Sequence, residues 1–581
     1  MENLTEQQIK GQVLDHLGLI AATIEKLDVI RQVDKLLPVA MDKGAKVTMG
    51  QRAAAMILNG LGFIDDRLYM FPRFLENKPV ERLLGKGLSA EQFNDDALGR
   101  FLDSVYKYGT TKFFTEIALK IGIDNCLLGK SAHFDTSTIS VYGEYVEKEA
   151  QKTSVVKPEN TENELPTVFN KEDKANEVGF NDSKQPIEIT YGYSKARRPD
   201  LKQMVINLAT TGAAGFPIWL EAHSGNASDK NVLVSASQKM KAFCETLKEA
   251  PDFLYVGDSA MYENSVKHMA DIKWLSRVPE SIGEARALLC KPDEAFSWTE
   301  QGNGYRISPL KSRYGCVEQR WLMVHSEQAF LRESKTLDKN IAREKEDIEK
   351  VLWHLSNQHF KCEVDAMQAA QEAVKKLKYH LTTFSVKTIK KHPKKGRPKK
   401  DDPEFTREYT IIGTLTPDEE KIMVTRRKKG RFILATTELD KEILSDAEIL
   451  FEYKGQSKTE SGFRFIKGNA FEVSSVFLKK PERIEALMAI MTLCLMVYSF
   501  AQHHLRATLE KCDDTLPNQM KKPTQKPTMA WICRMFHGVQ LLHITLPSST
   551  QQLVINLQET TKRIIRYFGP HAELIYGLHA G

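Results

Sequence analysis

The feature that most constrains this chain is an uncharged run of 16 residues from Ala486 to Ala501, ALMAIMTLCLMVYSFA. A transmembrane helix needs about 20 mostly apolar residues, and this run is shorter and contains Thr, Cys, Ser and several Met residues. We therefore predict a helix that is buried on all sides within a protein core, and we expect no membrane partner. The chain has 581 residues, of which 41% are hydrophobic, so it is long enough to form such a core.

Composition and charge narrow the class of protein only slightly. The chain carries 82 Lys and Arg against 76 Asp and Glu, a net charge of +6. This excludes a strongly acidic, solvating protein but does not by itself indicate nucleic acid. The eight cysteines are scattered without a CxxC pair, so we expect neither a disulfide framework nor a structural zinc site. The N-terminal sequence lacks the apolar core of a signal peptide, and we expect a cytoplasmic protein.

Hydrophobic periodicity predicts two kinds of structure along the chain. Residues 1–125 have apolar residues at i, i+3 and i+4 spacing and are expected to form a helical N-terminal domain, whose task is either DNA-end binding or dimerisation. A first strand-like segment begins at Ser131. After a polar excursion, three more at 187–194, 204–210 and 216–225 precede a helix, a strand, a helix and a strand, and this order predicts a mixed α/β sheet.

The expected domain boundaries follow from these patterns. The first part of the α/β domain is expected at 126–280, with a polar excursion at 144–186, an inserted mixed β/helical subdomain at 281–430, the second part of the α/β domain at 431–510, and a helical C-terminal region at 511–581.

Three acidic residues occupy positions that suit metal chemistry. Asp135 lies on the first predicted strand, Asp258 ends a buried strand, and Glu460 lies on a polar helix after the insertion. Carboxylates arranged in this way can bind two divalent cations about 3.5–4 Å apart and catalyse phosphoryl transfer. Such oxygen ligands favour Mg²⁺ or Mn²⁺. An Asp after a Gly at a strand end is also a common turn or cap residue, so spacing alone leaves both interpretations open.

The residues around Glu460 form one narrow stripe of a helix drawn at about 100° per residue. The stripe combines an aromatic ring, an amide, a carboxylate and two cations, and its members are Tyr453, Gln456, Glu460, Arg464 and Lys467. Such a stripe suits a metal-binding acid flanked by groups that hold a DNA backbone. A solvated polar face on a helix weakened by two glycines is the simpler interpretation.

The spacing Tyr-x2-Gln-x3-Glu-x6-Lys of this stripe resembles the Tyr-x2-Arg-x3-Glu-x6-Lys signature of one large branch of bacterial insertion-sequence DDE transposases. The layout is also similar to that branch, because the first Asp follows a helical N-terminal domain and a β-containing insertion precedes the Glu. The resemblance covers roughly residues 90–570. It implies an α/β ribonuclease H-like catalytic core in which Asp135, Asp258 and Glu460 hold two Mg²⁺ or Mn²⁺ ions per active site.

The same resemblance implies DNA-binding roles for the residues of the stripe that flank Glu460. Tyr453 and Lys467 would contact the phosphates of the transposon ends. Gln456 replaces the Arg of the family, and a Gln can donate a hydrogen bond but cannot neutralise a phosphate. We therefore expect either a weaker contact there or a charge supplied by Lys458 or Arg464.

A basic run, KTIKKHPKKGRPKK at 387–400, has eight Lys or Arg among fourteen residues and no acid. Its Gly-Arg-Pro core resembles an AT-hook, which fits an A·T-rich minor groove. A generic loop that touches phosphates is favoured, because clustered cations need no groove geometry, and a solubilising loop is the third possibility. The residues expected to contact DNA here are Lys394, Lys395, Arg397, Lys399 and Lys400.

The sequence thus predicts a DNA transposase that binds terminal inverted repeats, cleaves at the ends and joins the 3′-hydroxyls to target DNA by two-metal phosphoryl transfer. Its expected partners are double-stranded DNA, as transposon ends and as target, and a second copy of the chain as a homodimer in the DNA complex. When acting, it would be nucleoid-associated. Two alternatives stay open: a catalytically silent, transposase-derived DNA-binding protein, and a two-carboxylate hydrolase such as a glycosidase, against which the basic residues argue.

Overall fold

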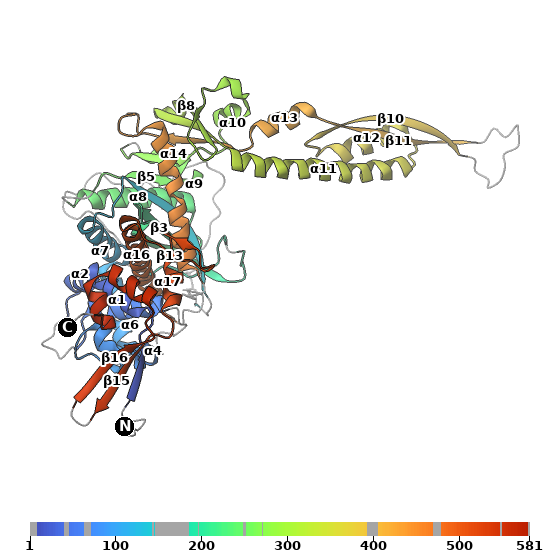
Figure 1. Cartoon of the computed structure of the whole chain (residues 1–581). Coiled ribbons are helices and arrows are strands. Elements are labelled where there is room, and N and C mark those ends of the chain that lie inside the picture. The colour runs from blue at the N-terminus through green and yellow to red at the C-terminus, as the bar shows by residue number, and fades with distance from the viewer. Residues whose placement is uncertain are drawn as a thin grey trace, which may run out of the picture. The chain divides into compact units, whose positions relative to one another are not determined.

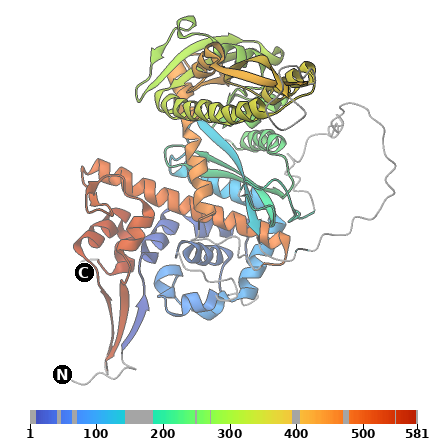
Figure 2. The ribbon, with the colours of Figure 1, turned by 90° about the vertical axis from the view of Figure 1, so that its right-hand side faces the viewer.

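The structure is a computed structural model that describes residues 9–39, 46–62, 71–141, 145, 185–195, 197–247, 251–269, 271–391, 405–468, 478–546 and 549–578. The chain divides into two compact units (Figures 1 and 2). The first consists of Met1–Leu275 and Phe451–Gly581, and the second of Ser276–Leu450. The second unit is therefore an insertion in the first, with bounds wider than the 281–430 expected from the sequence.

The first unit contains a mixed sheet, which confirms the α/β class. Its strands lie in the order β4-β3-β2-β5-β6, where β2 pairs antiparallel with β3, β3 with β4, and β2 pairs parallel with β5. The strands are β2 (Ser131–Val141), β3 (Lys202–Thr211), β4 (Phe216–Ser224), β5 (Leu254–Gly257) and β6 (Trp274–Arg277). Most residues of β2 to β5 are buried whichever way their side chains point, so both faces of this sheet are covered.

The long helix α16 (Pro481–Lys511) contains the uncharged run and packs inside the first unit. It is long and apolar enough to cross a membrane, but 78% of its most apolar window is buried inside the protein, as expected for a core helix. The N-terminal helices are α1 (Leu17–Lys26), α2 (Val29–Leu36), α3 (Met49–Leu61), α4 (Phe71–Glu76), α5 (Val80–Leu84), α6 (Asp95–Tyr108) and α7 (Thr110–Asp124). α16 contacts β4 and, among these helices, α1, α3, α6 and α7. The N-terminal helices therefore share one core with the sheet.

Both ends of the chain contain strands, and the one at the N-terminal end lies where a helical domain was expected. β1 (Ile9–Val13) pairs antiparallel with β15 (Gln540–Leu546), which pairs with β16 (Ser549–Ile555). The remaining C-terminal elements are β13 (Leu516–Pro517), β14 (Pro523–Thr524), α17 (Met529–Met535), α18 (Glu559–Phe568) and α19 (Pro570–Tyr576). The strand expected at 187–194 is reduced to one isolated bridge between Thr190 and Gln203.

The second unit has its own strand order, β12-β9-β8-β7, and a ribbon of two long strands, β10 and β11. Its strands are β7 (Thr299–Glu300), β8 (Tyr305–Ser312), β9 (Gln319–Ser326), β10 (His380–Lys391), β11 (Thr406–Pro417) and β12 (Arg431–Thr436). Its helices are α10 (Gly283–Cys290), α11 (Glu327–Asn357), α12 (Glu363–Val374) and α13 (Glu419–Arg427). β12 was expected to reopen the α/β domain; in the strand order it lies between β6 and β9, and it pairs antiparallel with β9.

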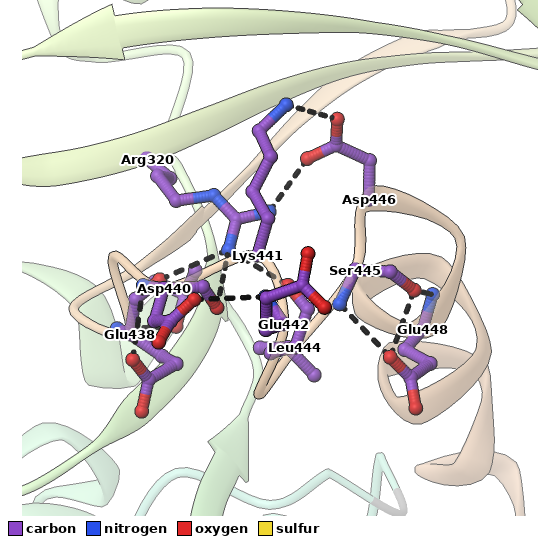
Figure 3. A network of polar contacts seen from close by, with 10 residues as sticks. Arg320, Glu438, Asp440, Lys441, Glu442, Leu444, Ser445, Asp446 and Glu448 are labelled. Carbon is purple, nitrogen blue, oxygen red and sulfur yellow. Dashed lines mark hydrogen bonds and ion pairs between the residues drawn. The ribbon is translucent and has the colours of Figure 1, made fainter.

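A buried arginine fixes the loop that follows β12 (Figure 3). Arg320 on β9 donates to the carbonyl oxygens of Glu438, Asp440 and Leu444 at 3.2, 3.4 and 2.7 Å. It also forms an ion pair with Asp446 at 2.6 Å, at the start of α14 (Asp446–Gly455). A planar guanidinium can satisfy several acceptors in fixed directions, so one side chain holds the whole loop.

Candidate active site

Asp135 and Asp258 lie at the same level of two neighbouring parallel strands. In the pairing of β2 with β5, each β2 residue faces the β5 residue 123 positions further along, as in the pair His133 and Val256. The same offset relates Asp135 to Asp258, two residues beyond that pair. Asp258 has extended backbone angles and so continues the direction of β5. Because neighbouring strands are about 4.8 Å apart, the sheet brings these two carboxylates together.

Asp258 also caps a helix. Its Oδ1 accepts a hydrogen bond of 2.9 Å from the backbone N–H of Ala260, at the start of α9 (Ser259–His268). The side chain is half-buried. The cap interpretation from the sequence is therefore correct.

Asp135 lies in an environment that disfavours its charge. Burial raises the pKa of its carboxyl to about 6, and the charges of Asp258 and Glu460 add to that rise. A hydrogen bond of 2.7 Å from the backbone N–H of Thr136 and the charge of Lys195 act in the opposite direction. The three predicted acids are thus within electrostatic range of one another around Asp135.

Glu460 reaches this place from α15 (Ser457–Ile466), which follows α14 after a single intervening residue. Side chains of the two helices bind the backbone and side chains of β2. The Thr459 hydroxyl donates to the carbonyl of His133 at 3.0 Å, and the Ser131 hydroxyl bonds Glu452. The Glu460 side chain itself is exposed, in the first turn of α15. It therefore lies at the solvent side of the acid cluster.

Close packing of α14 on β2 depends on Gly455. A Cβ atom at Gly455 would lie 2.6 Å from Cε1 of His133, whose ring is buried. Burial and the charge of Lys458 lower the pKa of His133 to about 4, so the ring is neutral at pH 7. Ser131, His133 and Glu452 were not predicted as a group, because they are distant in sequence and belong to no motif; we interpret them as the contact that holds α14 in place.

Some residues around Glu460 bind backbone carbonyl oxygens of other segments, and others are exposed to solvent. Gln456 is 8% exposed, and its amide nitrogen lies 3.4 Å from the carbonyl oxygen of Phe134 on β2. Lys458 donates to the carbonyl of Gly212 at 2.8 Å. Arg464 is exposed and contacts Ser461 of its own helix at 2.8 Å. In this conformation Arg464 is the more accessible cation, whereas Gln456 is engaged by the backbone of β2.

Two lysines flank Asp135. Lys467 donates to the hydroxyl of Ser137, two residues along β2, at 2.5 Å. Lys195 donates to the carbonyl and the hydroxyl of Thr136 at 2.9 and 3.0 Å. The pKa of Lys467 is lowered by burial and by the charge of Lys195, while the charge of Asp135 raises it. Lys195 was not predicted as a site residue. The only feature of the sequence that pointed to it is that it directly follows the strand expected at 187–194.

Of the remaining predicted DNA-binding residues, one lies within the part of the chain that the structure describes. Tyr453 on α14 is half-buried. The five cations predicted in the basic loop lie outside the described residues; they are Lys394, Lys395, Arg397, Lys399 and Lys400. Three lysines of the same run lie on β10 and are exposed: Lys387, Lys390 and Lys391.

The chemistry of the acid cluster fits a divalent cation, although its side chains do not form a ligand set. Burial raises the pKa of the Asp135 carboxyl and the charges of Asp258 and Glu460 add to the rise, and a bound cation would offset both effects. Among the described residues, no group of three or more His, Cys, Asp or Glu side chains is arranged closely enough to hold a metal ion. The exposed position of Glu460 accounts for this, because only Asp135 and Asp258 are placed together by the sheet.

Comparison with known proteins gives limited information. Residues 9–119 match a family model described as a domain of unknown function, DUF4277. The chain matches no curated protein. It is similar to a piggyBac transposase in a synaptic complex with hairpin DNA, solved by cryo-electron microscopy, at 9% identity and a TM-score of 0.32 over 97% of this chain and 88% of that one. A TM-score this low does not establish a common fold.

Proposed function

We propose that the chain is a DDE-type DNA transposase whose active site consists of Asp135, Asp258 and Glu460. The observation that carries this proposal is the register of Asp135 on β2 with Asp258 at the end of β5, with the charge of Glu460 on α15 contributing to the raised pKa of Asp135. These are the residues that the Tyr-x2-Gln-x3-Glu-x6-Lys motif and the chain layout selected beforehand. A carboxyl group of strongly shifted pKa that lies beside other acids is typical of catalytic sites.

The sheet supports a ribonuclease H-like core as part of the same proposal. From β2 the chain runs outward through β3 and β4, and then returns on the other side of β2 to β5. The β2–β5 boundary is therefore a point where the direction of strand succession reverses. Ligands of α/β sheets bind outside the carboxyl ends of the strands at such a point, and Asp258 follows the carboxyl end of β5 directly.

The proposed chemistry is in-line displacement at a DNA phosphodiester, first by water and then by the freed 3′-hydroxyl. Asp135 and Asp258 would hold divalent cations, with Glu460 as a third oxygen donor. Bound Mg²⁺ or Mn²⁺ would activate the attacking oxygen and stabilise the leaving oxygen. Arg464 and Lys467 lie on the helix that carries Glu460, where their charges can bind phosphates of the transposon ends.

The wider parts of the proposal follow from the same reaction. A reaction on two element ends needs two active sites, so we propose a homodimer in the DNA complex. The substrate would be the terminal inverted repeats of an insertion sequence, and the second partner would be target DNA. A catalytically silent descendant that binds DNA is the alternative, and the intact triad argues against it. A glycosidase is less well supported, because Lys195 and Lys467 surround the acids with positive charge.

The test is strand cleavage of labelled duplexes that carry the ends of the element, with Mg²⁺ or with EDTA. Wild type is expected to nick the end in Mg²⁺ only, and Asp258→Asn is expected to be inactive. Asn94→Ala is the matched control, because Asn94 caps α6 through Ala97 as Asp258 caps α9, but lies outside the acid cluster. Specific binding without cleavage in any divalent metal would favour the silent alternative, and cleavage by Asp258→Asn would place the active site elsewhere.

A further inference from the structure

The ribbon formed by β10 and β11 has one covered face and one free face. Its strands pair without interruption from His380 with Pro417 to Lys391 with Thr406. α11 and α12 pack against the ribbon, as Figure 1 shows within the second unit. The side chains on the covered face include Phe384, Val386, Tyr409 and Ile411.

The free face is uncharged over its first three outward rows. Side chains alternate along a strand, so the residues that point away from the helices are the odd-numbered ones of β10 and their partners on β11. These rows pair Leu381 with Thr416, Thr383 with Thr414, and Ser385 with Ile412. All six are exposed, and Leu381 and Ile412 are 51% and 47% accessible. The face thus combines four hydroxyls with two aliphatic side chains.

Cations gather at the far end of the same ribbon. Lys387, Lys390, Lys391 and Arg407 are all exposed. Glu408 is the only acid in the two described strands, and it is already bonded by Lys391 at 3.0 Å and by His359 at 2.8 Å. The ribbon is therefore basic, and Lys387, Lys390 and Arg407 retain charges that no carboxylate of the ribbon offsets. By the same alternation Lys387 lies on the free face, whereas Lys390 and its partner Arg407 form a row of the opposite face.

We propose that the free face of the β10–β11 ribbon docks into a groove of double-stranded DNA. A two-stranded ribbon has the width that the major groove admits. The Thr and Ser hydroxyls can both donate to and accept from base edges, and Leu381 and Ile412 can contact thymine methyl groups. Lys387, Lys390 and Arg407 would bind the flanking phosphates and position the ribbon. The surface differs from the acid cluster, and its binding to DNA does not require cleavage.

The charge of the ribbon selects DNA over a protein partner. An exposed aliphatic pair alone would equally suit a second copy of this chain. The second copy would bring the same cations to the same ribbon, and like charges facing each other oppose that contact. A phosphate backbone instead offers the complementary charge to the cations at the far end of the ribbon.

Binding of the full-length chain to a 30-bp random-sequence duplex tests the proposal, with fluorescence anisotropy in EDTA so that no strand is cut. The triple variant Lys387→Ala, Lys390→Ala, Arg407→Ala is expected to bind at least tenfold more weakly at moderate salt. The slope of log affinity against log salt should become shallower by about 2 to 3, roughly 0.9 for each lost phosphate contact. The control Lys335→Ala, Lys339→Ala, Lys350→Ala removes the same charge from exposed positions on α11 and should change affinity less than twofold.

A second variant tests the free face itself. Leu381→Asp with Ile412→Asp places two carboxylates where the groove would lie and should weaken DNA binding more than tenfold. Because both positions are exposed, the unfolding temperature of the variant protein should stay unchanged. Equal losses from the ribbon triple and the α11 triple would overturn the proposal, since any cation would then serve. Unchanged DNA affinity together with a shift from dimer to monomer in sedimentation would show that the face joins two copies. Because EDTA suppresses cleavage, failure of the proposed catalysis leaves this result unaffected.

Discussion

Asp135 on β2 and Asp258 after β5 occupy equivalent positions on adjacent parallel strands, related by the same register offset as the paired residues before them. This relationship separates two roles of Asp258, since the same side chain caps α9 through Ala260. Asn caps a helix about as well as Asp, whereas Ala forfeits about 0.5–2 kcal/mol. The two substitutions therefore separate folding from catalysis.

The first prediction uses that separation. Asp258→Asn should retain the wild-type free energy of unfolding to within about 0.5 kcal/mol, and Asp258→Ala should lose about 1 kcal/mol. Both should abolish metal-dependent cleavage, because neither offers an anionic oxygen. Urea unfolding and end-nicking assays measure the two effects. Equal destabilisation by Asn and Ala would show that the cap is not what Asp258 contributes to stability.

The second prediction concerns Asp135 and pH. Its folded pKa of about 6 lies above the ordinary 3.8 of Asp, so the folded state binds more protons between these values. The free energy of unfolding must then fall as pH rises from about 4 to about 6, by at most about 3 kcal/mol. Asp135→Asn removes this penalty and should be more stable than wild type at pH 7 in EDTA.

The control for Asp135→Asn is a substitution of an acid that is exposed instead of buried. Glu460 is exposed, so Glu460→Gln should change the free energy of unfolding by less than about 0.5 kcal/mol at any pH. Thermal unfolding of the three proteins at pH 4 and pH 7 compares them. A wild type that gains stability over this pH interval relative to Asp135→Asn would contradict the raised pKa.

The third prediction concerns Lys195, which donates to Thr136 and lies next to Asp135. A lysine beside a cation site repels the cation. Lys195→Met should therefore lower the Mg²⁺ concentration needed for half-maximal cleavage by roughly fivefold, equivalent to about 1 kcal/mol, even if the maximal rate falls. Lys107→Met, at an exposed position on α6, serves as the control. A higher Mg²⁺ requirement in Lys195→Met would show that Lys195 only supports the strand.

The fourth prediction tests the contact between α14 and β2. Gly455→Ala places a Cβ 2.6 Å from the buried ring of His133, and should destabilise the protein by about 1–3 kcal/mol despite the better helix propensity of Ala. Cleavage should fall with it, because α15 and Glu460 follow α14 directly. Gly283→Ala meets nothing within 4 Å at the start of α10 and should be neutral or slightly stabilising. Chemical unfolding and nicking of both variants decide the matter.

Local signals explain what the sequence could predict. The uncharged run identified α16 because its composition alone requires burial, and Asn94 was recognisable as a cap because the pattern lies within four residues. The pairing of β1 with β15 joins residues more than 500 positions apart and uses short, largely exposed strands, so no periodicity indicates it. The parallel pairing of β2 with β5 was likewise only implied by the order of elements.

In the candidate site too, local sequence patterns were predictable and contacts between distant segments were not. Asp135, Asp258 and Glu460 were selected by motif and layout; the register of β2 and β5 relates the first two, and the charge of Glu460 acts on Asp135, while their joint role stays a prediction. The burial of Gln456 against Phe134 and the approach of Lys195 to Thr136 depend on how helix and loop pack on β2. Those are tertiary contacts between distant segments, which spacing within one helix cannot encode. The contact of Gln456 with DNA therefore stays a prediction, and Arg464 is the better candidate to test first.

The last prediction concerns the loop after β12 and rests on Arg320 (Figure 3). Arg320→Met would leave three backbone carbonyls without this donor in a largely buried place, and Asp446 would keep only Lys441. An unsatisfied buried acceptor typically costs about 1–3 kcal/mol, so the variant should lose about 3 kcal/mol or more of its free energy of unfolding. Arg343→Met removes an exposed ion pair with Asp347 and should cost less than about 0.5 kcal/mol. Because Arg320 lies far from the acids in sequence and touches none of them, Arg320→Met protein that remains folded at low temperature should still nick DNA. Equal stability of the two variants would mean that water replaces the guanidinium without loss.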